Sequence, residues 1–220
     1  MPILRPHGRL SLCAEMVREG SRLADIGTDH GYLPIALCQS GKIPSALACD
    51  INPLPLRSAE VNIAGYDLSD RIQTRLSDGL KEVRPDEVDD VVIAGMGGEL
   101  IRDILAAAPW ITDKEKHLVL QPMTHHEDVA AWLYEQGFEI EAQKAALDEG
   151  KYYTVISARF SGEKKPCDRY TAVVGKLDLH DENSRGFLSR CLHNYRNKCK
   201  GEKSLLPLVQ QLEEALYEAE

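Results

Sequence analysis

The sequence is organised around the segment LADIGTDHGYLP, which runs from Leu23 to Pro34. Its first four residues are mostly small or branched apolar residues, which suit a parallel strand covered on both faces. Gly27 and Gly31 then permit a sharp turn and a close approach of the backbone to a ligand. We therefore expect a buried strand, a tight turn and a helix, with a ligand that carries a nucleoside lying across the turn.

Strand-like and helix-like segments alternate on either side of this turn. Besides 23–26, strands are expected over residues 44–50, 71–76, 88–94, 117–120, 138–147 and 152–160. Helices are expected over residues 9–18, 33–40, 55–65, 99–108 and 129–136. This alternation predicts an α/β fold with a mostly parallel seven-stranded sheet and helices on both faces. The last two strands should form an antiparallel hairpin at the sheet edge, which distinguishes a methyltransferase-type sheet from a plain dinucleotide-binding one.

The C-terminal region differs from the rest of the chain. Residues 161–166, with the sequence SGEKKP, are typical of a linker, and three apolar stripes at helical spacing follow them. We therefore expect two domains, over residues 1–162 and 163–220, the second a coiled-coil-like helical hairpin. The whole chain has a formal net charge of −9, but residues 164–203 contain 10 Lys and Arg against 5 Asp and Glu. This local basic surface could bind phosphates, although a solvated helix face would show the same pattern.

The composition is that of a globular protein. The 220 residues are 43% hydrophobic and 28% charged, without an apolar run long enough to span a membrane. Residues 1–7 contain no apolar segment of signal-peptide length, so we expect a cytoplasmic protein. The six cysteines form no Cys-x-x-Cys pair and are expected to be free thiols. Cys191, His193 and Cys199 match no common zinc spacing, so we expect no metal.

Acidic residues follow several of the expected strands, where the carboxyl ends of parallel strands share one crevice. Asp50 lies about 20 residues beyond the first turn, where a carboxylate can accept both ribose hydroxyls. Asp78 could accept the exocyclic amine of an adenine, although a single acidic residue after a strand is often only a helix cap. Asp29 stands where a pyrophosphate-binding turn has its middle glycine, with Asp25 beside it. Two carboxylates repel a pyrophosphate and suit a cationic sulfonium, which favours S-adenosylmethionine over NAD.

Four segments carry a resemblance to a known family. They are DIGTDHGYLP (25–34), IAGMGGELI (93–101), LQP (120–122) and GKYY (150–153). Together they resemble the bacterial tRNA 1-methyladenine methyltransferase family, which modifies adenine 22 in the D-arm of tRNA. The resemblance covers residues from about 9 to 160 and, in architecture only, the tail. Met123 stands where many members have Asn, and the following Thr-His-His replaces their usual neighbours.

The resemblance implies a class I methyltransferase with a Rossmann-like fold, S-adenosylmethionine as the cofactor, and a helical domain implicated in holding tRNA. The expected catalytic residues are Asp29, His30 and Tyr32. The expected cofactor-binding residues are Asp25, Gly27, Gly31, Asp50, Ile51, Asp78, Gly79, Ala94, Gly95, Met96 and Gly97. The expected substrate-binding residues are Arg5, Arg9, Gln121, Pro122 and His125.

The implied reaction is direct attack of adenine N1 on the sulfonium methyl group. Adenine N1 has an in-plane lone pair on a neutral ring, so the reaction needs alignment more than a general base. The methylated adenine is cationic, and the Asp29 carboxylate is our candidate for stabilising the developing charge. We expect tRNA as the partner, no membrane association, and a monomer in solution.

Three other functions remain open from the residues alone. The same fold could methylate another acceptor, such as ribosomal RNA or a small molecule. A nicotinamide-dependent oxidoreductase is disfavoured by Asp29 in the first turn. A catalytically silent adaptor could bind tRNA through the basic tail without transferring a methyl group.

Overall fold

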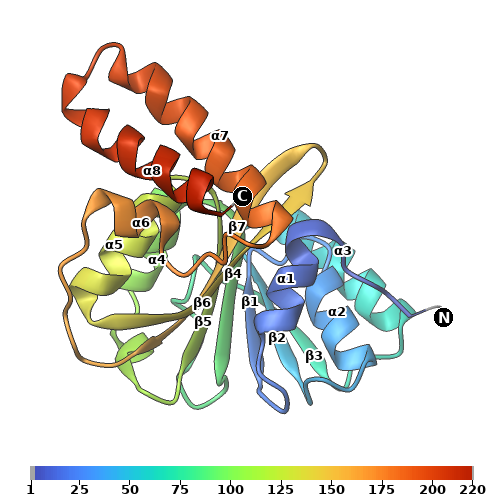
Figure 1. Cartoon of the computed structure of the whole chain (residues 1–220). Helices are drawn as coiled ribbons and strands as arrows, with labels where there is room; N and C mark the ends of the chain where they lie inside the picture. The colour runs from blue at the N-terminus through green and yellow to red at the C-terminus, as the bar shows by residue number, and fades with distance from the viewer. Residues whose placement is uncertain (1–2, 220) are drawn as a thin grey trace.

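A seven-stranded sheet runs through the computed structural model, which describes residues 3–219 (Figure 1). Residues 1 and 2, part of the stretch in which we expect no secretion signal, and residue 220 lie outside the described part. The strands are β1 (Leu23–Ile26), β2 (Ala46–Asp50), β3 (Ile72–Leu76), β4 (Asp90–Gly97), β5 (His117–Thr124), β6 (Phe138–Asp148) and β7 (Lys151–Phe160). Their order in the sheet is β3-β2-β1-β4-β5-β7-β6. Only the β5–β7 and β6–β7 pairs are antiparallel, which confirms the expected sheet and its terminal hairpin.

Helices cover both faces of the sheet and add a projecting C-terminal part (Figure 1). They are α1 (Gly8–Met16), α2 (Tyr32–Gln39), α3 (Pro53–Gly65), α4 (Gly98–Ala106), α5 (His126–Gln136), α6 (Arg169–Val174), α7 (Glu182–Cys199) and α8 (Leu206–Glu218), with short 3-10 helices η1 (Pro109–Thr112) and η2 (Lys203–Leu205). Within residues 3–219, no helix combines the length and the apolar character needed to cross a bilayer.

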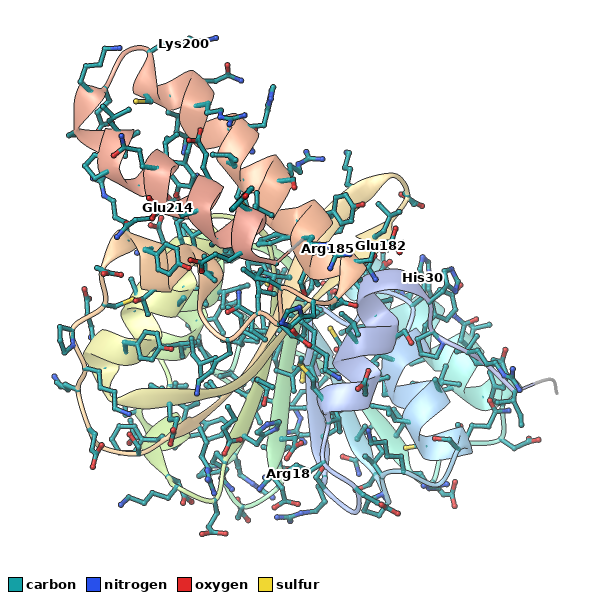
Figure 2. The ribbon with its side chains drawn as sticks, viewed as in Figure 1. Arg18, His30, Glu182, Arg185, Lys200 and Glu214 are labelled. Carbon is teal, nitrogen blue, oxygen red and sulfur yellow. The ribbon has the colours of Figure 1, made fainter. Side chains whose placement is uncertain are left out.

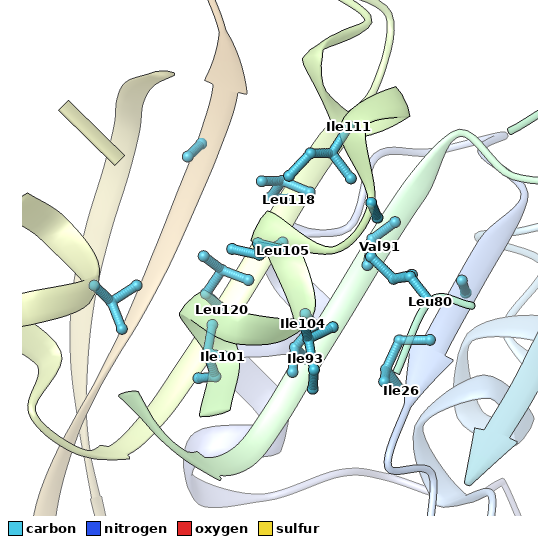
Figure 3. Packing of buried hydrophobic residues seen from close by; sticks show 14 of the residues in the cluster. Ile26, Leu80, Val91, Ile93, Ile101, Ile104, Leu105, Ile111, Leu118 and Leu120 are labelled. Carbon is cyan, nitrogen blue, oxygen red and sulfur yellow. The ribbon is translucent and has the colours of Figure 1, made fainter. Parts of the chain in front are cut away.

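Alternate side chains of the central strands enter two separate cores. Val91 and Ile93 of β4 pack with α4 and α5 on one face, and Figure 3 shows Ile101 and Leu105 of α4 in this core. Val92, between them in sequence, points to the other face and packs with α1, α2 and α3. A parallel strand covered on both faces therefore has to be apolar at every position, as in this run.

Two strands extend beyond their expected ends, and one of them is β5, which continues from the expected Leu120 to Thr124. We expected the fourth strand to stop at Gly95, but β4 continues to Gly97 because Met96 and Gly97 pair with Pro122 and Thr124 of β5. The pairing resumes after an irregularity in the register, which a sequence pattern of strict alternation does not signal. Helix α5 also begins at His126, three residues before its expected start.

The C-terminal helices pack together in a third apolar cluster. Its members come from α6, α7, η2 and α8, with Ala145 of β6 among them and Tyr152 of β7 packed against it. Figure 1 shows α7 and α8 as a pair that projects from the end of the sheet. This arrangement matches the expected helical hairpin, while the domain boundary at residues 162 and 163 stays a prediction.

A buried carboxylate connects three elements at the amino end of β4. Asp90 is fully buried and accepts hydrogen bonds from the Arg18 backbone N–H and Nε, both at 2.8 Å, and lies 3.2 Å from Nδ1 of His117. Nε2 of His117 is 2.8 Å from Ser157 Oγ, so the network reaches β7. Burial alone would raise the pKa of Asp90, but the hydrogen bonds from His117 and Arg18 outweigh it and hold the pKa below its ordinary value. Figure 2 shows Arg18 at the opposite end of the sheet from His30.

Replacement of Asp90 by asparagine is expected to lower the free energy of unfolding by about 2–3 kcal/mol, because it removes charge-assisted hydrogen bonds from a buried site. Chemical denaturation at pH 7 measures this change. The folded-state pKa of Asp90 is depressed, so its contribution is present above the ordinary value of 3.8 and is lost as the pH falls below it.

The matched control is Asp89→Asn. Asp89 pairs with Arg22 at 2.7 Å, but the two side chains are 34% and 42% exposed, so its loss should cost about 1 kcal/mol or less. Equal losses in the two variants would contradict the role given to the buried network.

Candidate active site

The loop between β1 and α2 opens into a cavity of about 240 Å³. Its wall contains the expected catalytic residues Asp29, His30 and Tyr32 together with Arg9 of α1. The remaining lining residues are Leu10, Asp25, Gly27, Thr28, Leu33, Ala94 and Gly95. The structure therefore brings the first turn and the end of β4 to one place, as expected from adjacent parallel strands.

Asp25 is a buried carboxylate at the centre of this crevice. It lies on β1 between Ala48 of β2 and Val92 of β4, and its Oδ2 accepts a hydrogen bond of 2.7 Å from Thr28 Oγ1. Burial raises the pKa of Asp25 to about 6, against the lowering effect of the Thr28 hydrogen bond, and the Asp50 charge raises it further. No cationic side chain within residues 3–219 forms an ion pair with it. A cationic group of a ligand would therefore stabilise its ionised form.

The first turn depends on residues in the left-handed conformation. Gly27 and Gly31 have φ values of +75° and +72°, and a Cβ on Gly27 would collide with the Met96 side chain. Asp29 adopts φ +52°, which is uncommon for a residue other than glycine. Its side chain is 68% exposed and lies 3.5 Å from His30 Nε2. Asp29 and His30 therefore stand at the open side of the cavity, while Asp25 forms its buried end.

The GMGG segment lets two loops come into contact. A Cβ on Gly98 would collide with the carbonyl oxygen of His125, so α4 can begin directly against the loop that precedes α5. Gly95 has φ +78°, and its N–H donates to Oε1 of Gln121 at 3.0 Å. Position 98 requires glycine because the two loops pack closely there, and position 95 favours glycine because its backbone is left-handed.

Gln121 and Pro122 are buried behind the Gly95 turn. The Gln121 side chain is fully buried, with Oε1 bonded to Gly95 and Nε2 donating to the Pro122 carbonyl at 3.0 Å. Both of its polar groups are thus used inside the protein. The observed role of Gln121 is to support the Gly95 turn, and the direct substrate contact that we expected of Gln121 and Pro122 stays a prediction.

The other expected cofactor residues lie at the same edge of the sheet. Asp50 is 9% exposed, and its Oδ1 accepts from the Asn52 N–H at 2.9 Å, whereas the following Ile51 is 59% exposed. Asp78 lies 2.5 Å from Lys81 Nζ beside Gly79, which has φ +60°. Asp78 also lines a separate cavity of about 160 Å³ next to α4.

A larger cavity of about 640 Å³ lies between α7, the β6–β7 hairpin and the loop before α5. His125 lines it, as do residues absent from the sequence-based prediction: Lys151, Tyr152, Tyr153, Phe187, Arg190, Asn194, Tyr195 and Lys198. Three sequence signals pointed here: the GKYY segment, the predicted substrate residue His125 and the basic stretch over residues 164–203.

Arg9 lies between the two cavities. It lines the smaller one, forms an ion pair with Asp148, and holds its guanidinium carbon 5.6 Å from the centre of the Tyr153 ring in the larger one. Arg5, by contrast, is exposed and lines neither cavity.

Comparisons with known proteins agree with this geometry. Residues 7–156 match a family described as a methyltransferase domain. The chain is 35% identical over 170 residues to the tRNA (adenine(22)-N(1))-methyltransferase of Bacillus subtilis strain 168, covering 77% of this chain and 71% of that one.

Two solved structures extend the likeness to the C-terminal helices. The Bacillus subtilis m1A22 tRNA methyltransferase has a TM-score of 0.80 and 26% identity, covering 97% of both chains. A Streptococcus pneumoniae protein in complex with S-adenosyl-L-methionine has a TM-score of 0.83 and 32% identity, covering 94% of this chain and 98% of that one. The methyltransferase-type sheet, the acidic first turn and these likenesses agree with one another, and the chain belongs to the tRNA (adenine(22)-N(1))-methyltransferase family.

Proposed function

We propose that this chain transfers the methyl group of S-adenosylmethionine to N1 of adenine 22 in tRNA. The observation that carries the proposal is the pair of carboxylates, Asp25 and Asp29, at the two ends of a cavity beside the open GMGG turn. A cationic sulfonium with an α-amino group fits this arrangement, whereas a pyrophosphate does not. The relative from Bacillus subtilis supports the choice of acceptor.

The residues present fit the proposed cofactor. The buried Asp25 carboxylate would receive the amino group of the cofactor's methionine part. Asp50 would accept the ribose hydroxyls, and Asp78 the exocyclic amine of the adenine. The other residues of the proposed cofactor site are Gly27, Gly31, Ile51, Gly79, Ala94, Gly95, Met96 and Gly97.

The bound cofactor would supply an electrophilic methyl group, and the chain would align the acceptor with it. N1 is on the Watson–Crick edge, so adenine 22 has to be unpaired or flipped out of a stack to react. The exposed Asp29 carboxylate would stabilise the positive charge that develops on the adenine. His30 and Tyr32, whose ring centres are 5.4 Å apart, would line the entrance for the base.

The proposal extends to the surroundings of the site. Arg5, Arg9 and His125 are proposed to contact tRNA, with Gln121 and Pro122 supporting the Gly95 turn behind the site. The helices after residue 162 are proposed to form a domain that holds the tRNA body. We further propose that the protein acts as a monomer in the cytoplasm.

Incubation of the protein with S-adenosylmethionine and an unmodified tRNA transcript tests the reaction directly. Nucleoside mass spectrometry should detect 1-methyladenine, and mapping should place it at position 22. Ribosomal RNA serves as the competing acceptor. Methylation of another atom, or tRNA binding without methyl transfer, would overturn the proposal.

Replacement of Asp29 by asparagine should lower kcat about 10-fold, because it removes a carboxylate that stabilises the positive charge developing on the adenine. Cofactor affinity should fall by a smaller factor, because the Asp29 side chain is 68% exposed and solvent screens its attraction to the cationic sulfonium. Asparagine tolerates the left-handed conformation of this position. Single-turnover methylation and calorimetric cofactor titration measure the two effects.

Asp67→Asn is the matched control for Asp29→Asn. Asp67 is also an exposed aspartate in the left-handed conformation, with φ +58°, and lines neither the 240 Å³ nor the 640 Å³ cavity. It should leave kcat unchanged. A normal kcat in Asp29→Asn would remove Asp29 from the catalytic group.

Replacement of Asp25 by asparagine should weaken cofactor binding and stabilise the free protein at pH 8. The pKa of Asp25 is raised from 3.8 to about 6 in the folded state, so its ionisation costs stability as the pH rises through this range. An asparagine oxygen can still accept from Thr28, and the gain should be about 3 kcal/mol at most. Thermal unfolding from pH 4 to pH 8 measures it. A variant less stable than the wild type at pH 8 would contradict the uncompensated burial of this charge.

A further inference from the structure

The larger cavity has walls from three distant parts of the sequence. They are the segment from Met123 to Glu127 that joins β5 to α5, the start of β7 from Lys151 to Tyr153, and one side of α7 from Phe187 to Lys198. On α7, Phe187, Arg190, Cys191, Asn194, Tyr195 and Lys198 recur at helical spacing and line the cavity. Its volume of about 640 Å³ falls in the range that accommodates one small organic ligand.

The cavity adjoins the proposed cofactor site. Thr124 in its wall is paired with Gly97 at the end of β4, and Tyr153 in its wall lies beside Arg9 of the smaller cavity. An RNA strand whose target adenine reaches the GMGG turn would therefore continue past Thr124 and Tyr153 into the larger cavity.

The chemistry of the lining matches a nucleotide. Tyrosine and histidine rings supply surfaces on which a base can stack, and the side-chain amide of Asn194 supplies a donor and an acceptor. Lys151 and Arg190 are exposed and form no ion pair within residues 3–219. Glu127 is the single carboxylate of the lining, so the cavity favours an anionic group such as a phosphate.

Contacts among the lining residues hold the three walls together. Glu127 Oε1 accepts a hydrogen bond of 3.0 Å from the Tyr195 hydroxyl, and Glu127 Oε2 lies 3.1 Å from His126 Nδ1. The His126 ring packs edge-on against Phe187, with ring centres 4.8 Å apart. A Cβ on Gly186 would collide with the Tyr152 ring, so α7 lies directly on the hairpin. Glu127 is thus engaged by Tyr195 and His126, and Lys198 Nζ lies 5.2 Å from the centre of the Tyr195 ring, so Lys151 and Arg190 are the cations that face a ligand.

We propose that this cavity is a second nucleotide subsite, which binds one unpaired nucleotide beside the target adenine, with its base against the aromatic wall and its phosphate near Arg190 and Lys151. The proposal rests on the proposed function and adds a site to it. A half-open cavity of about 640 Å³ admits a single nucleotide but not a duplex. Extrusion of the target adenine interrupts local stacking, and a subsite for its neighbour would stabilise the opened strand.

The test compares Lys151→Gln/Arg190→Gln with Arg196→Gln/Lys203→Gln. The control removes the same charges, but Arg196 pairs with Glu213 and neither control residue lines the cavity. The cavity variant should raise the Kd for the tRNA transcript about 10-fold or more and reduce the magnitude of the salt slope by about 1, because one phosphate contact is lost, whereas the control should lower affinity much less. Cofactor affinity should be unchanged in both variants, which verifies that they are folded.

A scan of transcripts with single neutral methylphosphonates identifies the bound phosphate. In the wild type, substitution beside the target adenine should weaken binding, and in Arg190→Gln the same substitution should have little further effect. Equal behaviour of cavity and control variants, or coupling spread over phosphates of both strands of a stem, would overturn the subsite. If the wild type methylates no tRNA, the proposed function itself fails, and the two failures are therefore distinguishable.

Discussion

Burial of the Asp25 carboxyl group inside the sheet is the constraint on which the rest of the site depends. The strands on either side present Ala48 and Val92, neither of which can hydrogen-bond to it through a side chain. The chain must therefore turn back at Gly27, in the left-handed conformation, to bring the Thr28 hydroxyl to Asp25. Burial outweighs this single hydrogen bond, so the pKa of Asp25 is raised to about 6. A cationic ligand would stabilise the ionised carboxylate. The buried charge of Asp25 destabilises the free protein, and it lies where the proposed cationic cofactor would compensate it.

Close contacts at two glycines join the first turn to the neighbouring loops. Met96 packs over Gly27, and Gly98 leaves room for the His125 carbonyl, so the ends of β1, β4 and β5 form one continuous surface. Because β4 and β5 remain paired to Gly97 and Thr124, this surface extends toward α7 and the hairpin. The two cavities are consequently neighbours, which places the proposed methyl acceptor between the cofactor and the C-terminal helices.

The buried carboxyl groups at the two ends of the sheet, Asp90 and Asp25, have opposite pKa shifts. At the amino end, Asp90 is surrounded by Arg18 and His117, and its pKa is held below the ordinary value. At the carboxyl end, Asp25 has no such cation and its pKa is raised. The Asp90 charge is therefore compensated inside the protein, whereas the Asp25 charge is left for a cationic ligand to compensate.

The sequence by itself determined the strands, the terminal hairpin, the acidic first turn and the family, because short-range periodicity and glycine placement encode them locally. Only the tertiary structure decided that Gln121 faces inward to Gly95, that β4 continues to Gly97, and that Arg9 meets Asp148 from 139 residues away. It also created the larger cavity, whose walls come from three segments that carry no common sequence pattern. These features depend on how segments distant in sequence pack together and on which buried polar atoms still need a hydrogen-bond partner. The local preference of a residue for helix or strand specifies neither of these.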